Sequence, residues 1–441
     1  MTTRAVYLGF VSVIAVLRCS AQPQPSIPNT DYQEKWGYIT VRPQAHMFWW
    51  LMYKSDTSRP LVVWLQGGPG ASSTGFGNFE ELGPLDADLK PRSTTWLNRA
   101  DLIFIDNPVG TGYSYVDSSS AFTTNVDEIA ADLLTWSKQW FDAHAEFQAR
   151  PFFIMCESYG GKMTAAWAKV LYDAVQKGDV KANFKGIGLG DSWISPIDYV
   201  TTWPDHLQAF SFLGNGSYSV LRTTANQCLS YVNRGEWNFA TNCWDEMESD
   251  IEMATDSVSF YNVLKRSGSD PWSKNRSKHP MTAVDRLFQR HVIAPYAAGS
   301  LSDLMNGQIK QKLGIPNNVT WGGQSGEVFS KQNTDFMKPV VSTVDHLLMN
   351  TNVKVSVFNG QLDLICCTLG TQKWVNRLTW PHLSNFHKAT RHHVRVKNDQ
   401  TGMFYKTYDN LSFYWILRGG HMVAHDAPEA VDNMLQRIFQ G

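Results

Sequence analysis

Short, continuously apolar runs alternate with helical periodicity along most of the chain. Residues that are apolar at every position predict strands buried on both faces of a sheet. Such runs lie at 61–65, 102–105, 152–156, 353–358 and 413–417, and two further strands are expected at 36–41 and 47–53. Helical periodicity lies at 126–139, 162–175, 336–349 and 428–439. This alternation predicts an α/β fold with a mostly parallel sheet flanked by helices.

The alternation of short apolar runs and helical periodicity stops between residues 193 and 326. This interval is polar, rich in Asn, Ser and Trp, and helical where it is periodic. We predict that it is a mainly helical cap inserted into one α/β core, whose two parts are 22–192 and 327–441. An independent second domain is the alternative that the sequence leaves open.

The N-terminus has the pattern of a secretory leader. Arg4 precedes an apolar run that ends at Leu17, and small residues follow up to Ala21, so we predict a signal peptide at residues 1–21. No later stretch reaches the roughly 18 apolar residues of a membrane span. We therefore expect a secreted or lysosomal protein. Acceptor triplets for N-glycosylation agree with this route and lie at Asn215, Asn275, Asn318 and Asn410.

Charge balance and the spacing of the cysteines limit the partners, disulfides and metal sites that the sequence predicts. The 441 residues carry 39 Lys plus Arg and 40 Asp plus Glu, and this balance argues against nucleic acid as the main partner. Beyond the predicted leader, Cys228 and Cys243 stand 15 residues apart in one segment and are the best candidates for a disulfide. Adjacent Cys366 and Cys367 are expected to be buried thiols. The spacing of Cys and His indicates no metal site.

Residue types that nucleophilic catalysis needs stand just past predicted strands. Ser158 lies between a strand and a predicted helix, the context of a nucleophile elbow, although Cys156 replaces the usual first glycine. Asp363 follows a later strand, and His421 follows the last strand and two glycines. The carboxyl ends of parallel strands meet at one edge of a sheet. We therefore predict a triad of Ser158, Asp363 and His421, and prefer His421 to His425 because His425 falls in the next turn.

An oxyanion hole requires two N–H donors near the nucleophile. One is expected from Tyr159, the residue after the serine. The other is expected from a glycine-rich loop that follows an early strand, with Gly68 as the candidate.

Six blocks of sequence, in this order, resemble the serine carboxypeptidase family of α/β-hydrolases. They are WLQGGPGASS (64–73), FEELGPL (79–85), DNPVGTGYSY (106–115), ESYGGK (157–162), NGQLDLIC (359–366) and GGHMV (419–423). Two further blocks, MFWWL (47–51) and GLGDSWISP (188–196), resemble the retinoid-inducible group within that family. The resemblance implies an α/β-hydrolase fold with an inserted cap, and catalysis without a metal or an organic cofactor.

The resemblance also implies a substrate. Members of the family remove one C-terminal residue at a time at acidic pH, so peptide or protein C-termini are the expected partners; a homodimer is left open. The substrate carboxylate is then expected to meet Gln66, Gly67 and Glu157, with Glu81 paired to Glu157. Gln66 departs from the family, which has an asparagine there; the extra methylene could displace a hydrogen bond by about 1 Å.

The expected carboxyl pair has a physical consequence of its own. Two neighbouring carboxyls cannot both ionise cheaply, so one keeps its proton and can donate a hydrogen bond to a carboxylate. Hydrolysis of peptides should then decline toward neutral pH, and substrates with a blocked C-terminus should decline less. The same triad would also serve an acyltransferase or an esterase, and a non-catalytic protective or scaffold protein could retain it. The sequence leaves these alternatives open.

Overall fold

The computed structural model describes residues 31–267, 282–293 and 299–440, so the expected signal peptide and Asn275 lie outside the described residues. The described chain forms an 11-stranded sheet with the order β1-β2-β4-β3-β6-β7-β8-β11-β10-β9, and β5 pairs with β2. The strands are β1 (Gln33–Arg42), β2 (Ala45–Tyr53), β3 (Leu61–Leu65), β4 (Asp101–Ile105), β5 (Tyr115–Val116), β6 (Pro151–Ser158), β7 (Asn183–Ser192), β8 (Lys354–Gly360), β9 (His392–Val396), β10 (Gln400–Tyr408) and β11 (Leu411–Ile416).

The centre of the sheet is parallel. Strands β4, β3, β6, β7, β8 and β11 pair in parallel, and antiparallel strands extend the sheet at both ends. All five residues of β3 and of β4 are buried; they are apolar except Asp101, which pairs with Arg59 and Arg150. The prediction of a mostly parallel α/β sheet is confirmed.

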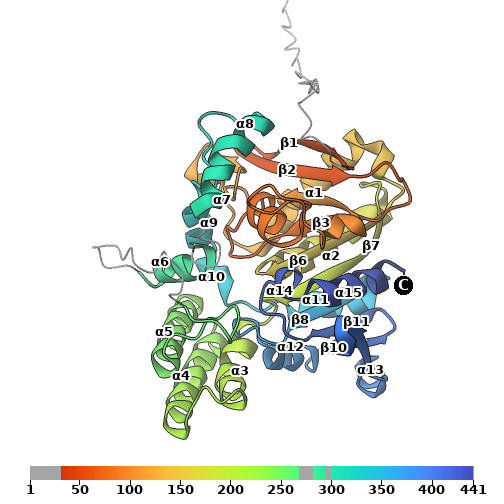
Figure 1. The fold of residues 1–441 in the computed structure, drawn as a ribbon. Helices are drawn as coiled ribbons and strands as arrows, with labels where there is room; N and C mark the ends of the chain where they lie inside the picture. The colour runs from red at the N-terminus through yellow and green to blue at the C-terminus, as the bar shows by residue number, and fades with distance from the viewer. Residues whose placement is uncertain (1–30, 268–281, 294–298, 441) are drawn as a thin grey trace, which may run out of the picture. The chain divides into compact units, whose positions relative to one another are not determined.

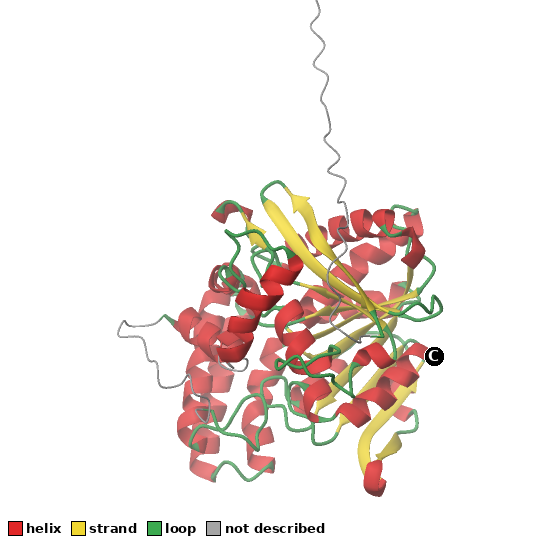
Figure 2. Cartoon of the chain, turned by 45° about the horizontal axis from the view of Figure 1, so that its top comes forward, coloured by secondary structure: helices red, strands yellow, loops and turns green. Residues whose placement is uncertain are grey.

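Helices cover both faces of this sheet (Figure 2). Neighbouring residues of a strand point to opposite faces. In β6, the ring of Phe152 contacts Phe141 and Trp167, whereas the ring of Phe153 contacts Phe439. The first two partners belong to α1 and α2, and the third to α15. The helices are α1 (Val126–Ala143), α2 (Gly160–Lys177), α3 (Pro196–Ala209), α4 (Asn215–Asn233), α5 (Trp237–Thr255), α6 (Ala283–Phe288), α7 (Gly299–Leu304), α8 (Lys310–Leu313), α9 (Ser325–Lys331), α10 (Asn333–Phe336), α11 (Val341–Asn350), α12 (Thr368–Val375), α13 (Leu383–Lys388), α14 (Val423–Asp426) and α15 (Pro428–Gln440).

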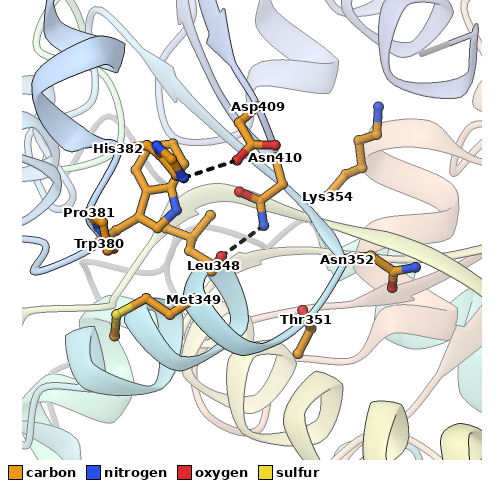
Figure 3. Close-up of a pocket in the computed structure, with 10 residues that line it drawn as sticks. All are labelled: Leu348, Met349, Thr351, Asn352, Lys354, Trp380, Pro381, His382, Asp409 and Asn410. Carbon is orange, nitrogen blue, oxygen red and sulfur yellow. Dashed lines mark hydrogen bonds and ion pairs between the residues drawn. The ribbon is translucent and has the colours of Figure 1, made fainter.

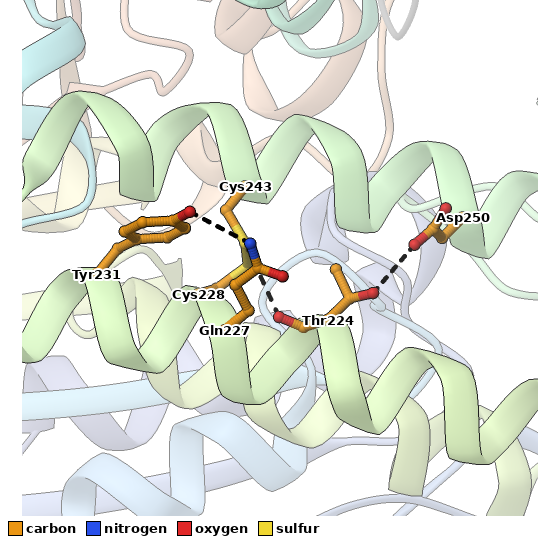
Figure 4. The surroundings of a disulfide bond; sticks show 6 residues. All are labelled: Thr224, Gln227, Cys228, Tyr231, Cys243 and Asp250. Carbon is orange, nitrogen blue, oxygen red and sulfur yellow. Dashed lines mark hydrogen bonds between the residues drawn. A yellow bond between two sulfur atoms is a disulfide. The ribbon is translucent and has the colours of Figure 1, made fainter.

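Helices α3 to α8 fall in the interval 193–326, drawn green to teal in Figure 1. The prediction of a mainly helical segment agrees with this, while its limits and its role as a cap stay a prediction. Helices α4 and α5 are joined by a disulfide between Cys228 and Cys243, which confirms the expected pair (Figure 4). Residues 260–263 of the interval contact the loops that follow β8 and β11: the N–H of Val263 donates to Leu362 O at 2.9 Å, and Tyr261 O accepts from the N–H of His421 at 2.7 Å.

The structure differs from the predicted elements in two ways: one expected helix is divided, and strands β5, β7, β9 and β10 are additional to the predicted strands. The helix expected over 336–349 is two helices, because α10 ends at Phe336 and α11 begins at Val341. Pro339 lies in the break; it has no N–H and disfavours helical geometry at the residue before it. Strand β7 was not predicted. Its glycines hide it from an apolar pattern, yet a Cβ atom at Gly188 would lie 2.5 Å from Met155 Cε.

Candidate active site

Ser158 ends β6, and Tyr159 opens the turn into α2. The φ angle of Ser158 is 58°, in the left-handed region that non-glycine residues seldom adopt. The sheet register shifts between Glu157 and Ser158, so the side chain is turned out at the end of the strand. Ser158 is half-buried, while its two neighbours are buried. The local geometry is that of a strained strand-to-helix elbow, as the sequence predicts.

Asp363 and His421 form a buried pair. His421 Nδ1 lies 3.0 Å from Asp363 Oδ2, and both side chains are at most 1% exposed. The N–H of His421 donates to Tyr261 O at 2.7 Å, and the Tyr261 ring stands edge-on to the imidazole at 4.9 Å. The opposite ring nitrogen, Nε2, lies 4.0 Å from Glu157 Oε1 and therefore faces the end of β6 that carries Ser158. Burial lowers the pKa of His421 to about 4.

The structure separates His421 from its neighbour in sequence. His425 Nδ1 lies 3.1 Å from Glu80 O, on an exposed part of α14. Asp426 is also engaged elsewhere, because its Oδ2 accepts from the N–H of Gly420 at 2.9 Å and from Asn262 Nδ2 at 3.0 Å. Asp426 thus shapes the loop before His421, whereas Asp363 contacts the imidazole itself.

The glycine-rich loop after β3 lies directly against Ser158. A Cβ atom at Gly67 would lie 2.5 Å from Ser158 Cβ and 3.0 Å from Ser158 Oγ, so any larger side chain would displace the serine or the loop. Gly68 follows with a φ of 106°. On the other side, Tyr159 is held by its buried hydroxyl, which donates to Asp335 Oδ2 at 3.1 Å. Both segments that supply the expected oxyanion donors therefore adjoin Ser158.

Three of the residues expected to meet a substrate carboxylate form one buried cluster. Gln66 Nε2 donates to Glu81 Oε1 at 2.8 Å and to Glu157 Oε1 at 3.1 Å. Gln66 Oε1 in turn accepts from Trp64 Nε1 at 2.6 Å. Burial raises the pKa of Glu81, and burial together with Glu81 raises the pKa of Glu157 well above its usual value. The cluster favours protonated carboxyls at acidic pH.

Sequence reasoning missed Asp191. This buried residue ends β7 beside Asn359 and Gly360 of β8, and its side chain contacts that of Asp363. The rule that polar residues at strand ends carry the chemistry would have found it, had β7 been recognised.

The acceptor asparagines have different surroundings. Asn215 and Asn318 are exposed. Asn410 is half-buried and lines a pocket of about 510 Å³ that contains none of the other predicted site residues (Figure 3). There its Nδ2, the atom that would carry a glycan, donates to Leu348 O at 3.1 Å. Among the described helices, none is both long and apolar enough to cross a bilayer.

The comparison with known proteins agrees with the geometry. The family model for serine carboxypeptidases matches residues 23–441. Retinoid-inducible serine carboxypeptidase of Mus musculus is 48% identical over 414 residues, which cover 92% of this chain and 91% of that protein. The Homo sapiens protein of the same name is 46% identical over 421 residues, with coverages of 94% and 93%.

A solved structure is similar over nearly the same length. It is that of Kex1Δp, a prohormone-processing carboxypeptidase from Saccharomyces cerevisiae, with a TM-score of 0.78 at 19% identity, covering 93% of this chain and 91% of that one. The likeness supports the fold alone, and the family match supplies the chemistry. The chain has the α/β-hydrolase fold and belongs to the serine carboxypeptidase family, whose members are hydrolases.

Proposed function

We propose that this protein is a serine carboxypeptidase of the secretory pathway that removes C-terminal amino acids from peptides at acidic pH. The observation that carries the proposal is the buried cluster of Gln66, Glu81 and Glu157 beside Ser158. An esterase or an acyltransferase needs a nucleophile, a base and oxyanion donors, but it has no use for two buried carboxyls at this place. The sequence of the leader and the exposed acceptors Asn215 and Asn318 support the secretory route.

The proposed reaction is acyl transfer to Ser158. His421 takes the Ser158 Oγ proton on Nε2 as the oxygen attacks the last peptide carbonyl, and Asp363 holds the proton on Nδ1. The N–H groups of Gly68 and Tyr159 stabilise the oxyanion. His421 then passes its proton to the leaving amino group, and the C–N bond breaks. Water, activated by the same imidazole, hydrolyses the acyl-enzyme and regenerates the serine.

The carboxyl cluster would select substrates with a free C-terminus. A protonated Glu157 donates a hydrogen bond to the substrate carboxylate, next to the N–H of Gly67. Gln66 already donates to both glutamates, so we assign it the role of bracing the pair. This role accommodates the longer side chain, because a glutamine reaches both carboxyls while its oxygen accepts from Trp64.

The two pKa directions define an acidic working range. The raised pKa of Glu157 means that the donor is protonated in acid and is lost as pH rises through that value. The pKa of His421, lowered to about 4, means that the base stays neutral until pH falls to that region. Activity on peptides should therefore be highest above about pH 4 and should fall toward neutrality.

The test is mass spectrometry of peptides incubated with the purified protein across this range. Each peptide is supplied with a free and with an amidated C-terminus, and Ser158→Ala is the control. Stepwise loss of C-terminal residues from the free form in acid, absent in the variant, is the expected result. Labelling of Ser158 by an organophosphonate without any peptide shortening would overturn the carboxypeptidase and point to an esterase or acyltransferase. Absence of labelling would point to a non-catalytic protein.

A further inference from the structure

Asp191 occupies an unusual place next to the proposed triad. It stands at the carboxyl end of β7, is 1% exposed, and has a φ of 39°. Ser158, at the end of the neighbouring strand β6, also has a left-handed backbone. Such conformations are energetically unfavourable for non-glycine residues, and they cluster at functional sites.

The two oxygens of Asp191 differ in their partners. Oδ1 accepts from Asn359 Nδ2 at 2.6 Å and from the N–H of Gly360 at 2.7 Å. Oδ2 is buried, and none of the described residues donates a hydrogen bond to it. The Asp191 side chain is nevertheless within hydrogen-bonding reach of the Asp363 side chain. Two carboxylates have only acceptors, so a hydrogen bond between them requires a proton.

The surroundings indicate which carboxyl carries that proton. Asp363 already accepts on both oxygens, from His421 Nδ1 at 3.0 Å and from the N–H of Cys366 at 3.2 Å. Asp191 Oδ2 has no donor and is therefore the protonation site. The other titratable side chains that act on Asp191 or Asp363 are His421, Glu157, Cys366, Cys367 and Tyr261, and all of these except the half-buried Tyr261 are buried. Burial raises the pKa of both aspartates well above its usual value, which agrees with a proton held between them.

We propose that Asp191 is a positioning residue whose protonated carboxyl donates a hydrogen bond from Oδ2 to Asp363 and thereby fixes the carboxylate that orients His421. The inference rests on the proposed function, because it assumes that Asp363 and His421 act as the base. Protonation also leaves one negative charge rather than two beside the imidazole. A second charge would favour the imidazolium and weaken the base in acid.

The informative variants are Asp191→Asn and Asp191→Ala. Asparagine mimics the protonated acid: its oxygen can accept from Asn359 and Gly360, and its N–H can donate to Asp363. We expect Asp191→Asn to hydrolyse a C-terminally blocked ester in acid within a few-fold of the parent. Asp191→Ala removes the donor and should lose about 10- to 100-fold in kcat/KM, as is typical when a supporting hydrogen bond is deleted. The blocked ester keeps the Glu157 pair out of the readout.

The pH profile separates positioning from a merely structural role. The parent loses the Asp191 proton as pH rises, whereas Asp191→Asn has none to lose. The two profiles should coincide in acid and diverge toward alkaline pH, where only the parent declines. Asp345→Asn is the matched control, since this buried aspartate accepts, within the described part of the chain, only from Thr379 and Trp380. This variant should have a lower unfolding temperature than the parent and the same pH profile of kcat/KM.

Infrared difference spectroscopy tests the proton without turnover. The parent should show a protonated-carboxyl band in acid that is missing in Asp191→Asn. This result does not depend on peptide hydrolysis. The role of Asp191 can therefore be refuted while the carboxypeptidase function holds, and the carboxypeptidase function can be refuted while the role of Asp191 holds. An unchanged band would overturn the inference. A folded Asp191→Asn as inactive as Asp191→Ala at every pH, although the parent Ser158 reacts with an organophosphonate, would also overturn it.

Discussion

Glutamine at position 157 would keep the proposed hydrogen-bond donor and remove its pH dependence. In the parent, Glu157 can donate to a substrate carboxylate only while it is protonated, and its raised pKa confines this state to lower pH. A glutamine has the same shape and carries N–H donors at every pH. Its oxygen can still accept from Gln66 Nε2, which lies 3.1 Å from Glu157 Oε1. Glu157→Gln should therefore be active where the parent has lost its donor.

The size of the effect follows from the type of hydrogen bond. A bond to a charged group contributes about 1.5–3 kcal/mol. At 1.4 kcal/mol per factor of ten, this is about 10- to 150-fold in kcat/KM. Glu157 is 1% exposed, so bulk water does not screen the interaction. In acid the variant should match the parent within a few-fold, and near neutral pH it should exceed the parent by up to that factor.

The assay measures kcat/KM for a peptide and for its C-terminal amide across the acidic and neutral range. The matched control is Glu146→Gln, because Glu146 is an exposed glutamate that pairs with Lys35 at 2.6 Å. The control should keep the parent profile. The reasoning fails if Glu157→Gln declines toward neutral pH as steeply as the parent. It also fails if the amide and the free peptide share one profile in the parent protein.

Other substitutions and conditions test the rest of the site. Gly67→Ala places a methyl group 2.5 Å from Ser158 Cβ. It should lower kcat/KM about 100-fold for peptides and esters alike. A variant whose kcat/KM stays within a few-fold of the parent would contradict the proposed packing. For a blocked ester, the acid limb of kcat/KM should lie near the lowered pKa of His421, about 4; a limb near the usual histidine value would show that the imidazole is solvated in solution. Glycopeptide mass spectrometry should find glycan on exposed Asn318 and not on Asn410, whose Nδ2 is bonded to a main-chain carbonyl; full occupancy of Asn410 would refute this.

The sequence predicts those strands and helices whose burial is evident from the pattern of their own residues. The run at 61–65 is β3 to the residue, because a central parallel strand is covered on both faces and tolerates only apolar side chains. The disulfide was predictable for a similar local reason, since Cys228 and Cys243 are only 15 residues apart, in the consecutive helices α4 and α5. Ser158, Asp363 and His421 could be found because strand ends converge in a parallel sheet.

Strand β7 escaped prediction because its pattern is set by neighbouring strands. Met155 of β6 fills the space over Gly188, and the Phe358 ring of β8 fills the space over Gly190. The glycines are thus imposed by side chains distant in sequence, and no local rule recovers them. Asp191 was missed as a consequence. Glu81 and Glu157 were reached only through the family resemblance, since nothing local predicts that two carboxyls 76 positions apart share one buried amide.

The two proposed protons lie on either side of His421 and have separable effects. The proton on Glu157 forms the hydrogen bond to the substrate carboxylate, so its loss should lower activity only on substrates with a free carboxylate. The proton on Asp191 serves the base, so its loss should affect every acyl substrate. An ester with a blocked C-terminus reports the second alone, and the ratio of peptide to ester activity reports the first. Combining Glu157→Gln with Asp191→Asn should therefore extend peptide hydrolysis to higher pH than either change alone; if one substitution produced the whole extension, a single shared ionisation would govern both sides of the imidazole.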